Sequence, residues 1–127
     1  MKTLFIDDDV FRFDRMVELG HIPPDSVHVD NGLKAIDAIV DDGPWCAIFF
    51  DHDLATFVAD HYPREITGND VARVLARMDW KPLSVVIHST NPVGASNIRN
   101  TLADAGIGST IKPFWSFMEN ENDLQAN

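Results

Sequence analysis

Two apolar segments of this chain end in carboxylates. The runs at residues 4–6 and 46–50 are each followed directly by acids, which are Asp7, Asp8, Asp51 and Asp53. Carboxylates that are brought together repel one another unless a cation neutralises them. Hard oxygen ligands of this kind suit Mg²⁺, which keeps several waters and a substrate phosphate in its shell. The pattern predicts an acidic site for Mg²⁺ or Mn²⁺, although Asp7 and Asp8 could instead cap the first helix.

Two later segments add groups that bind phosphate. Ser89 and Lys112 follow the apolar runs 84–88 and 107–111 at positions comparable to those of the acids. A hydroxyl and an ammonium group beside a cation can position a phosphoryl group and neutralise its charge, and phosphoryl transfer mainly requires these two things. We therefore expect Asp51, Ser89 and Lys112 to surround one phosphoryl group.

His52 and His88 are the candidate acid and base, because histidine titrates near neutral pH. Residues alternate between the two faces of a strand, so His52 would face away from Asp51, and His88 away from Ser89, unless the strands have already ended. A purely structural role, with the histidine bonded to the backbone, stays open for each of them.

A turn after the fourth apolar run offers an anion site. The stretch NPVGASN begins at Asn91 and leads into a predicted helix, whose first backbone N–H groups are free to bind an anion. The residues expected to contact a ligand there are Asn91, Gly94, Ser96 and Asn97.

The elements that must position these groups alternate along the chain. The candidate strands are residues 4–6, 27–29, 46–50, 84–88 and 107–111, and the candidate helices are residues 10–19, 33–40, 68–78 and a segment that ends at Gly106. This order predicts an α/β fold, an open five-stranded parallel sheet with helices on both faces. Ligands bind such sheets beyond the carboxyl ends of the strands, where the acids would gather.

Three further expectations complete the organisation. Residues 1–118 should form one domain, with an acidic flexible tail at 119–127. Residues 55–67 show no clear period and are expected to form a long loop or a disordered lid. Asp9 is expected only to cap the first helix.

Composition limits the partners and the compartment. The chain has 127 residues, a net charge of −10 and a pI near 4.6, which argues against binding nucleic acid through a basic surface. It has no apolar run of membrane-spanning length and no signal peptide pattern. The single cysteine fits a reducing compartment, so we expect a cytoplasmic location.

Taken together, these motifs resemble the receiver domain of two-component response regulators over roughly residues 1 to 115, with its flavodoxin-like fold. The resemblance implies that Asp7 and Asp8 are the metal-binding pair, that Asp51 is the phosphoacceptor and that Asp53 completes the metal shell through its backbone. It also implies that Ser89 and the Lys112–Pro113 pair contact the phosphoryl group, with a cis peptide before the proline.

The departures from ordinary receivers lie around the expected site. They are His52, His88, the long segment 55–67 and the stretch HSTNPVGASNI after the fourth strand. With DHDL and Thr67-Gly68, they are similar to cyclic-phosphate-processing receiver domains, which are often met in phage and bacterial genomes.

Two functions from different classes follow from this resemblance. The favoured one is a metal-dependent phosphoesterase for cyclic phosphates or related small phosphoesters. The alternative is a single-domain response regulator that a partner kinase phosphorylates on Asp51, or a phage-type binding module on the same fold. The aromatic residues after Lys112 are also compatible with a homodimer.

Overall fold

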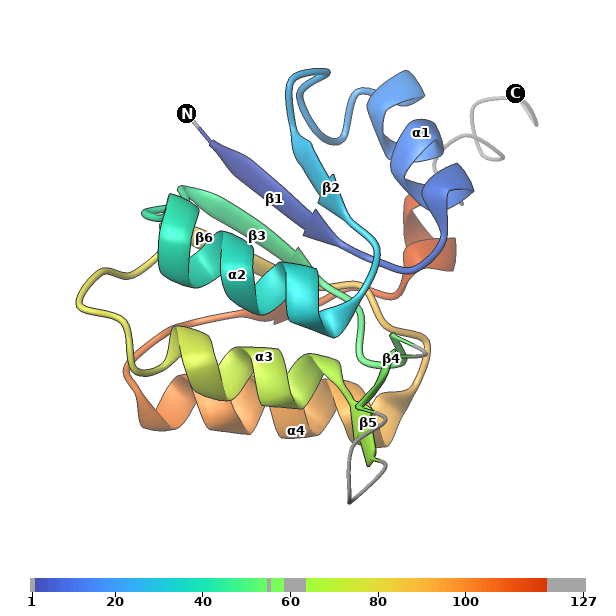
Figure 1. Cartoon of the computed structure of the whole chain (residues 1–127). Coiled ribbons are helices and arrows are strands. Elements are labelled where there is room, and N and C mark those ends of the chain that lie inside the picture. The colour runs from blue at the N-terminus through green and yellow to red at the C-terminus, as the bar shows by residue number, and fades with distance from the viewer. Residues whose placement is uncertain (1, 55, 59–63, 119–127) are drawn as a thin grey trace.

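The computed structural model describes residues 2–54, 56–58 and 64–118. Its centre is a five-stranded parallel sheet in the order β2-β1-β3-β6-β7 (Figure 1). The strands are β1 (Thr3–Ile6), β2 (Val27–Val29), β3 (Ala47–Phe50), β6 (Ser84–Ile87) and β7 (Thr110–Ile111). All five lie within or next to the apolar runs that predicted them, so the predicted fold class is confirmed.

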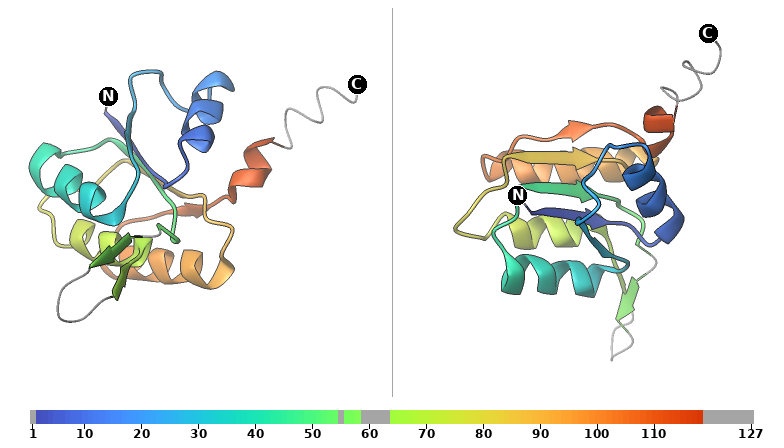
Figure 2. Two further views of the ribbon diagram at one scale, coloured as in Figure 1. Left: turned by 45° about the vertical axis from the view of Figure 1, so that its right-hand side comes forward. Right: turned by 90° about the horizontal axis from the view of Figure 1, so that it is seen from above.

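Helices cover both faces of the sheet (Figure 2). They are α1 (Val10–Glu18), α2 (Gly32–Asp42), α3 (Gly68–Leu75) and α4 (Pro92–Asp104). Helices α2, α3 and α4 pack on one face over the larger hydrophobic core, which includes Ile48 and Phe50. Helix α1 and the short helical segment 114–118 pack on the other face, around Phe5 and Phe49. No described helix is long and apolar enough to cross a bilayer.

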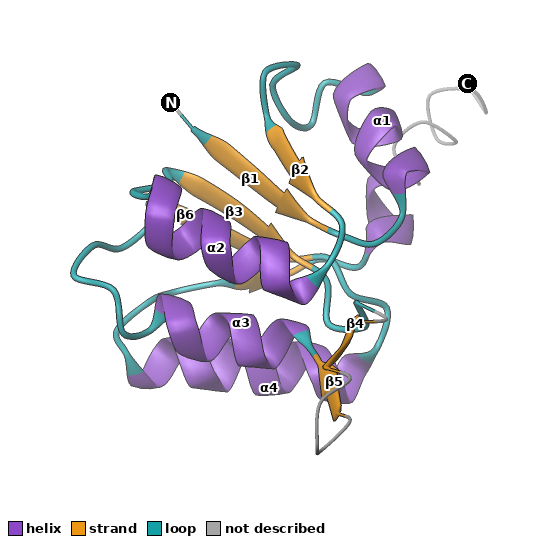
Figure 3. Cartoon of the chain, in the orientation of Figure 1, coloured by secondary structure: helices purple, strands orange, loops and turns teal. Residues whose placement is uncertain are grey.

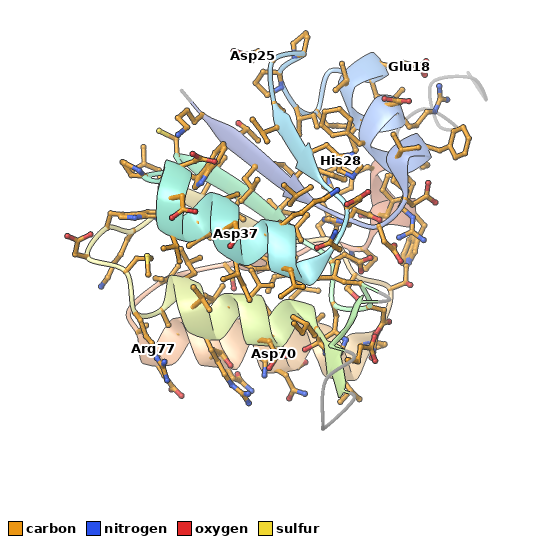
Figure 4. All side chains as sticks on the ribbon, in the orientation of Figure 1. Glu18, Asp25, His28, Asp37, Asp70 and Arg77 are labelled. Atoms are coloured by element: carbon orange, nitrogen blue, oxygen red, sulfur yellow. The ribbon has the colours of Figure 1, made fainter. Side chains whose placement is uncertain are left out.

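Local sequence signals set the ends of the helices. The Asp9 carboxylate accepts from the Phe11 N–H at 2.9 Å, so the prediction that Asp9 caps α1 is confirmed. Asn91 caps α4 in the same way, accepting from the Gly94 N–H at 3.0 Å. On the surfaces of the helices, Asp37 of α2 and Arg77 just after α3 lie on the outside of the molecule (Figure 4).

The expectation of a structureless segment at 55–67 is wrong where the chain is described. Strand β4 (Thr56–Val58) pairs antiparallel with β5 (Arg64–Ile66) in a small separate sheet (Figure 3). Residues 55 and 59–63 of that segment lie outside the described residues, as does the predicted tail. The hairpin is tied to the domain by Ile66, which is 4% exposed and packs against Gly32, where a Cβ atom would lie 2.5 Å from Ile66 Cγ2. Cross-strand pairing and the buried Ile66 stabilise the hairpin, and both are hard to predict from so short an apolar pattern.

Candidate metal and phosphoryl site

Strand register places three functional side chains next to one another. Ile6, Phe50 and Ile87, the last residues of β1, β3 and β6, lie in register across the sheet. The ladder continues one residue further, because the Asp51 N–H donates to the Ile6 carbonyl at 3.0 Å and the His88 N–H to the Phe50 carbonyl at 2.9 Å. The next residue of each strand, Asp7, Asp51 and His88, therefore comes to the same edge of the sheet.

These three side chains form a compact buried cluster. Their ligand atoms lie within 4.8 Å of one another, and the residues are 0%, 4% and 1% exposed. His88 Nε2 lies 2.9 Å from Asp7 Oδ2, and the His88 ring stacks on Phe5 at 4.7 Å with planes only 8° apart. The imidazole plane is thus set by an aromatic ring below it and a carboxylate at its edge.

The sequence left open whether His88 faces the site, and the ladder that continues to this residue brings its Nε2 atom to the acids. Both His88 and Ser89 are buried. The Ser89 hydroxyl accepts from the Asn91 N–H at 3.1 Å, which holds it at the turn into α4. The other nitrogen of the ring, His88 Nδ1, is buried and has no hydrogen-bond partner, whereas Nε2 faces the acids.

The charges in the cluster oppose one another. Burial and the neighbouring Asp7 carboxylate raise the pKa of Asp51 to about 6. Burial also acts to raise the pKa of Asp7, but the hydrogen bond and charge of His88 outweigh it and the pKa is lowered. Burial and the charge of Asp7 raise the pKa of Asp8, an exposed residue that lies outside the compact cluster. A divalent cation would relieve this repulsion.

Arg12 is the residue of this site that sequence reasoning missed. Its Nη1 atom lies 3.4 Å from Asp7 Oδ2 and 3.5 Å from Asp51 Oδ2, and its Nε atom lies 3.6 Å from Asp9 Oδ2. Those carboxylates raise the pKa of the guanidinium despite its partial burial. The only available signal was its place in the first turn of a helix that begins directly after the acids.

A second histidine–carboxylate pair lies beside the first. His52 Nδ1 is 2.8 Å from Asp53 Oδ1, and the Asn91 amide lies 3.4 Å from the same oxygen. The His52 ring packs on the first turn of α4, where a Cβ atom on Gly94 would come within 2.3 Å of it. The Asp53 carboxylate therefore faces His52 and Asn91 and is not part of the compact cluster.

Gly68 also allows a close approach to this segment. A Cβ atom there would lie 2.1 Å from the Asp51 carbonyl oxygen, and the Gly68 N–H donates to the His52 carbonyl at 2.8 Å. The start of α3 thus holds the backbone of Asp51 and His52.

Of the other residues expected to bind a ligand, Ser96 and Asn97 are exposed on α4.

The Lys112 side chain lies against an aromatic ring of the segment after β7. Its ammonium nitrogen sits 4.2 Å above the centre of the Phe117 ring, and the described ion pairs of Asp7 and Asp51 are with Arg12 and His88. The implied cis peptide before Pro113 is wrong, since the cis bond found among the described residues is Gly43–Pro44. The Lys112 and Phe114 N–H groups donate to the Ile87 and His88 carbonyls, and this pairing keeps the chain along β6 with a trans proline.

His28 has a role beyond that of an ordinary strand residue. It lies on β2 (Figure 4), and its Nε2 atom is 2.7 Å from the backbone oxygen of Asp7. Its ring stacks on Phe13 of α1 at 4.9 Å. His28 thus holds the backbone of Asp7 in place.

The donor set fits a divalent cation. Two carboxylates and one imidazole nitrogen lie close enough together to bind one ion, and Asp8 adds negative charge nearby. An all-oxygen set would suit Mg²⁺, whereas a mixed set that includes imidazole also suits Mn²⁺ and softer transition metals.

Solved structures share this fold. A CheY-like response regulator receiver domain from Methylobacillus flagellatus superposes with a TM-score of 0.63 and 16% identity, covering 99% of this chain and 97% of its own. Response regulator TrrA from Thermotoga maritima, solved with Mg²⁺-BeF, gives a TM-score of 0.62 and 15% identity, covering 98% and 96%. The receiver domain of a sensor histidine kinase from Pseudomonas aeruginosa, with magnesium coordinated in its active-site cleft, gives 0.61 and 16%, covering 98% and 94%.

The sequence comparisons are more specific. A comparison with curated proteins gives no match. Residues 2–104 match the family described as the cyclic-phosphate processing receiver domain. This match spans most of the chain, including both histidine–carboxylate pairs and Arg12. The chain therefore belongs to the cyclic-phosphate processing receiver domain family.

Proposed function

We propose that this protein is a metal-dependent phosphoesterase that opens cyclic phosphates or related small phosphoesters. The observation that carries the proposal is His88, a buried imidazole paired with Asp7 at 2.9 Å beside Asp51. A receiver that only accepts a phosphoryl group needs acids, a cation and a counter-charge. A buried histidine within the acidic cluster adds a nitrogen donor that such a role does not use.

The cation is proposed to be Mn²⁺ or Mg²⁺, held by Asp7, Asp51 and His88 with Asp8 nearby. When bound, it would neutralise charge on the phosphoryl oxygens and lower the pKa of a water molecule. The imidazole nitrogen of His88 favours Mn²⁺ over Mg²⁺ as the bound ion. The guanidinium of Arg12, which already contacts Asp7 and Asp51, would neutralise further phosphoryl charge.

His52 is the proposed group for proton transfer. Its side chain is 15% exposed, and Asp53 orients it through Nδ1, as a carboxylate does for a catalytic histidine. In the reaction, an oxygen of water forms a bond to phosphorus, one ester P–O bond breaks, and the leaving oxygen takes up a proton. His52 would receive the proton of the water and return one to the leaving oxygen, which yields a phosphomonoester. The backbone turn at Asn91 and Gly94, with Ser89, is the proposed anion contact.

A second candidate is a signalling module that is phosphorylated on Asp51. It is supported by the place of Asp51 directly after β3 and by the similar fold of TrrA, which was solved with Mg²⁺-BeF.

Turnover of a small panel of substrates tests the proposal. The purified protein is incubated with Mn²⁺ or Mg²⁺ and with 2′,3′-cyclic and 3′,5′-cyclic nucleotides, and Asp51→Asn serves as the control. Turnover that needs both the metal and Asp51 is the expected result. A stable phosphoaspartate formed from acetyl phosphate, without turnover of any cyclic phosphate, would instead establish the signalling module.

A further inference from the structure

A pocket opens at the surface beside the acidic cluster. It has a volume of about 350 Å³ and is lined by Asp9, Phe11, Arg12, Arg15 and Phe114, and we name it the α1 pocket. Its volume lies in the lower part of the range of small-molecule sites, about 300–1,000 Å³. The lining comes from the start of α1 and from the segment that follows β7, so tertiary contact forms it.

Two aromatic rings make the apolar part of this pocket. Phe11 is 79% exposed, although it lies on the first turn of α1 directly after the acids. Phe114 is held beside the site because its N–H donates to the His88 carbonyl at 2.8 Å. The exposed face of an aromatic side chain can stack with a flat ring of a ligand. Core packing does not explain an aromatic side chain at this exposed position, whereas stacking with a ring of a ligand would explain it.

The charged residues of the pocket favour an anion only on the side of Arg12. Two arginines and one aspartate line it, in a chain whose net charge is −10. Arg12 contacts Asp7 and Asp51 and lies 5.7 Å from the centre of the Phe114 ring, so it stands between the acidic cluster and the pocket. Asp9 would repel an anion, which places an anionic group towards Arg12 and a neutral ring towards Phe11 and Phe114.

We propose that the α1 pocket binds the base of a nucleotide, with Arg12 between the base and the phosphate at the acidic cluster. This inference rests on the proposed function and specifies its substrate class, a nucleotide that carries a cyclic phosphate. The Asp9 carboxylate suits an amino group on the base. Stacking on Phe11 and Phe114 would select nucleotides over phosphoesters that lack an aromatic ring.

Binding to two probes that a cyclic phosphoesterase does not consume tests the subsite. Calorimetry in the presence of Mn²⁺ compares adenosine 3′-phosphate with ribose 5-phosphate, which lacks a base. The wild-type protein should bind the nucleotide more tightly. Phe11→Ala should weaken nucleotide binding about tenfold and leave ribose 5-phosphate unchanged, because one stacking contact contributes that much.

Two variants serve as controls. Leu83→Ala removes a side chain that is 85% exposed at the start of β6, the opposite end of the sheet, and should change neither affinity. Phe11→Trp keeps an aromatic face and should retain nucleotide binding. Phe11 is so exposed that its replacement should not prevent folding, and a thermal melt checks this.

Several results would overturn the subsite. These are absence of nucleotide binding, equal affinity for both probes, or an equal effect of Phe11→Ala on both. A change of oligomeric state in Phe11→Ala, seen by sedimentation with nucleotide affinity unchanged, would make the pocket an interface between copies.

Turnover separates the two proposals. Equal hydrolysis of cyclic phosphates with and without a base removes only the subsite, and nucleotide binding without any turnover removes only the phosphoesterase.

Discussion

The molecule holds two histidine–carboxylate pairs of the same chemistry in different surroundings. His88 and Asp7 lie 81 residues apart in the chain and meet at 2.9 Å with both side chains fully buried. His52 and Asp53 are neighbours in the chain and meet at 2.8 Å, with the carboxylate 61% exposed. The buried pair is part of the packing of the sheet, whereas the exposed pair can exchange protons with solvent. Burial suits His88 and Asp7 for the proposed metal site, and contact with solvent suits His52 and Asp53 for the proposed proton transfer.

The largest difference between the pairs should appear in stability. We expect His88→Ala to lower the free energy of unfolding by about 3–5 kcal/mol, because it removes the buried partner of the Asp7 carboxylate and leaves the longer contact to Arg12. His52→Ala should cost less, because the Asp53 carboxylate that it leaves behind is 61% exposed and stays hydrated. Urea unfolding of both variants measures this, and His88→Gln, which keeps a donor, should fall between them. Equal losses for both alanine variants would contradict the distinction.

Turnover should depend on the exposed pair through proton transfer and not through metal binding. If His52 transfers protons, His52→Asn should lower kcat about 100-fold while leaving Mn²⁺ affinity within about twofold of wild type. Asp53→Asn should have a smaller effect in the same direction, since it orients the ring and does not transfer the proton. Steady-state kinetics and a metal titration measure the two quantities. A loss of Mn²⁺ binding in His52→Asn would place this histidine in the metal shell.

Burial of the Asp51 carboxyl and its repulsion from Asp7 should make the stability of the protein depend on pH. The pKa of Asp51 is about 6 in the folded protein, whereas an ordinary aspartate has a pKa of 3.8, so the folded state holds this proton more tightly. Stability from this group is then present below about pH 4 and is lost as the pH rises to about 6. Asp51→Asn should stabilise the metal-free protein by on the order of 2 kcal/mol at about pH 7.

That gain should vanish below about pH 4, where Asp51 is protonated in both states. Denaturant unfolding of wild type and variant over this pH range, with a chelator present, provides the difference curve and cancels the other carboxylates. A variant that is less stable than wild type at neutral pH would show that Arg12 compensates the charge of Asp51 in full.

The smallest expected effect concerns the choice of metal. Because His88 adds a nitrogen donor, Mn²⁺ should bind more tightly than Mg²⁺, by about tenfold or more. His88→Asn should bring the two affinities closer together, whereas His52→Asn should leave their ratio unchanged. Titration with each ion, followed by calorimetry, measures the ratios. Equal affinities in the wild-type protein would indicate that His88 stays on Asp7 and outside the metal shell.

Much of the fold could be predicted because its signals are local. The apolar runs that became β1, β3 and β6 are continuous, as expected for strands that are covered on both faces. Asp9 was recognised as a helix cap from residue type alone. Hairpin β4–β5 was missed because its strands are three residues each, too short to show an apolar period.

The candidate site was predicted in outline and not in its contacts. The strand ends indicated Asp7 and Asp51 together with Asp8 and Asp53, because parallel strands bring their carboxyl ends to one edge. His88 was expected as an acid or base, and it takes the third place in the compact cluster. The contact partner of the Lys112 ammonium group could not be predicted. Whether this group reaches a carboxylate or the Phe117 ring depends on the path of the chain after β7. Arg12 was missed because a helix surface residue gains meaning only when the facing strands are in place.

The sequence by itself determined the alternation of strands and helices and the helix caps, since each depends on residues close together in the chain. Only the tertiary structure decided that Asp7 meets His88 and that Arg12 reaches Asp51. The physical reason is register. One hydrogen-bonded ladder across β1, β3 and β6 brings side chains from three distant segments within 4.8 Å, and no local pattern encodes that distance.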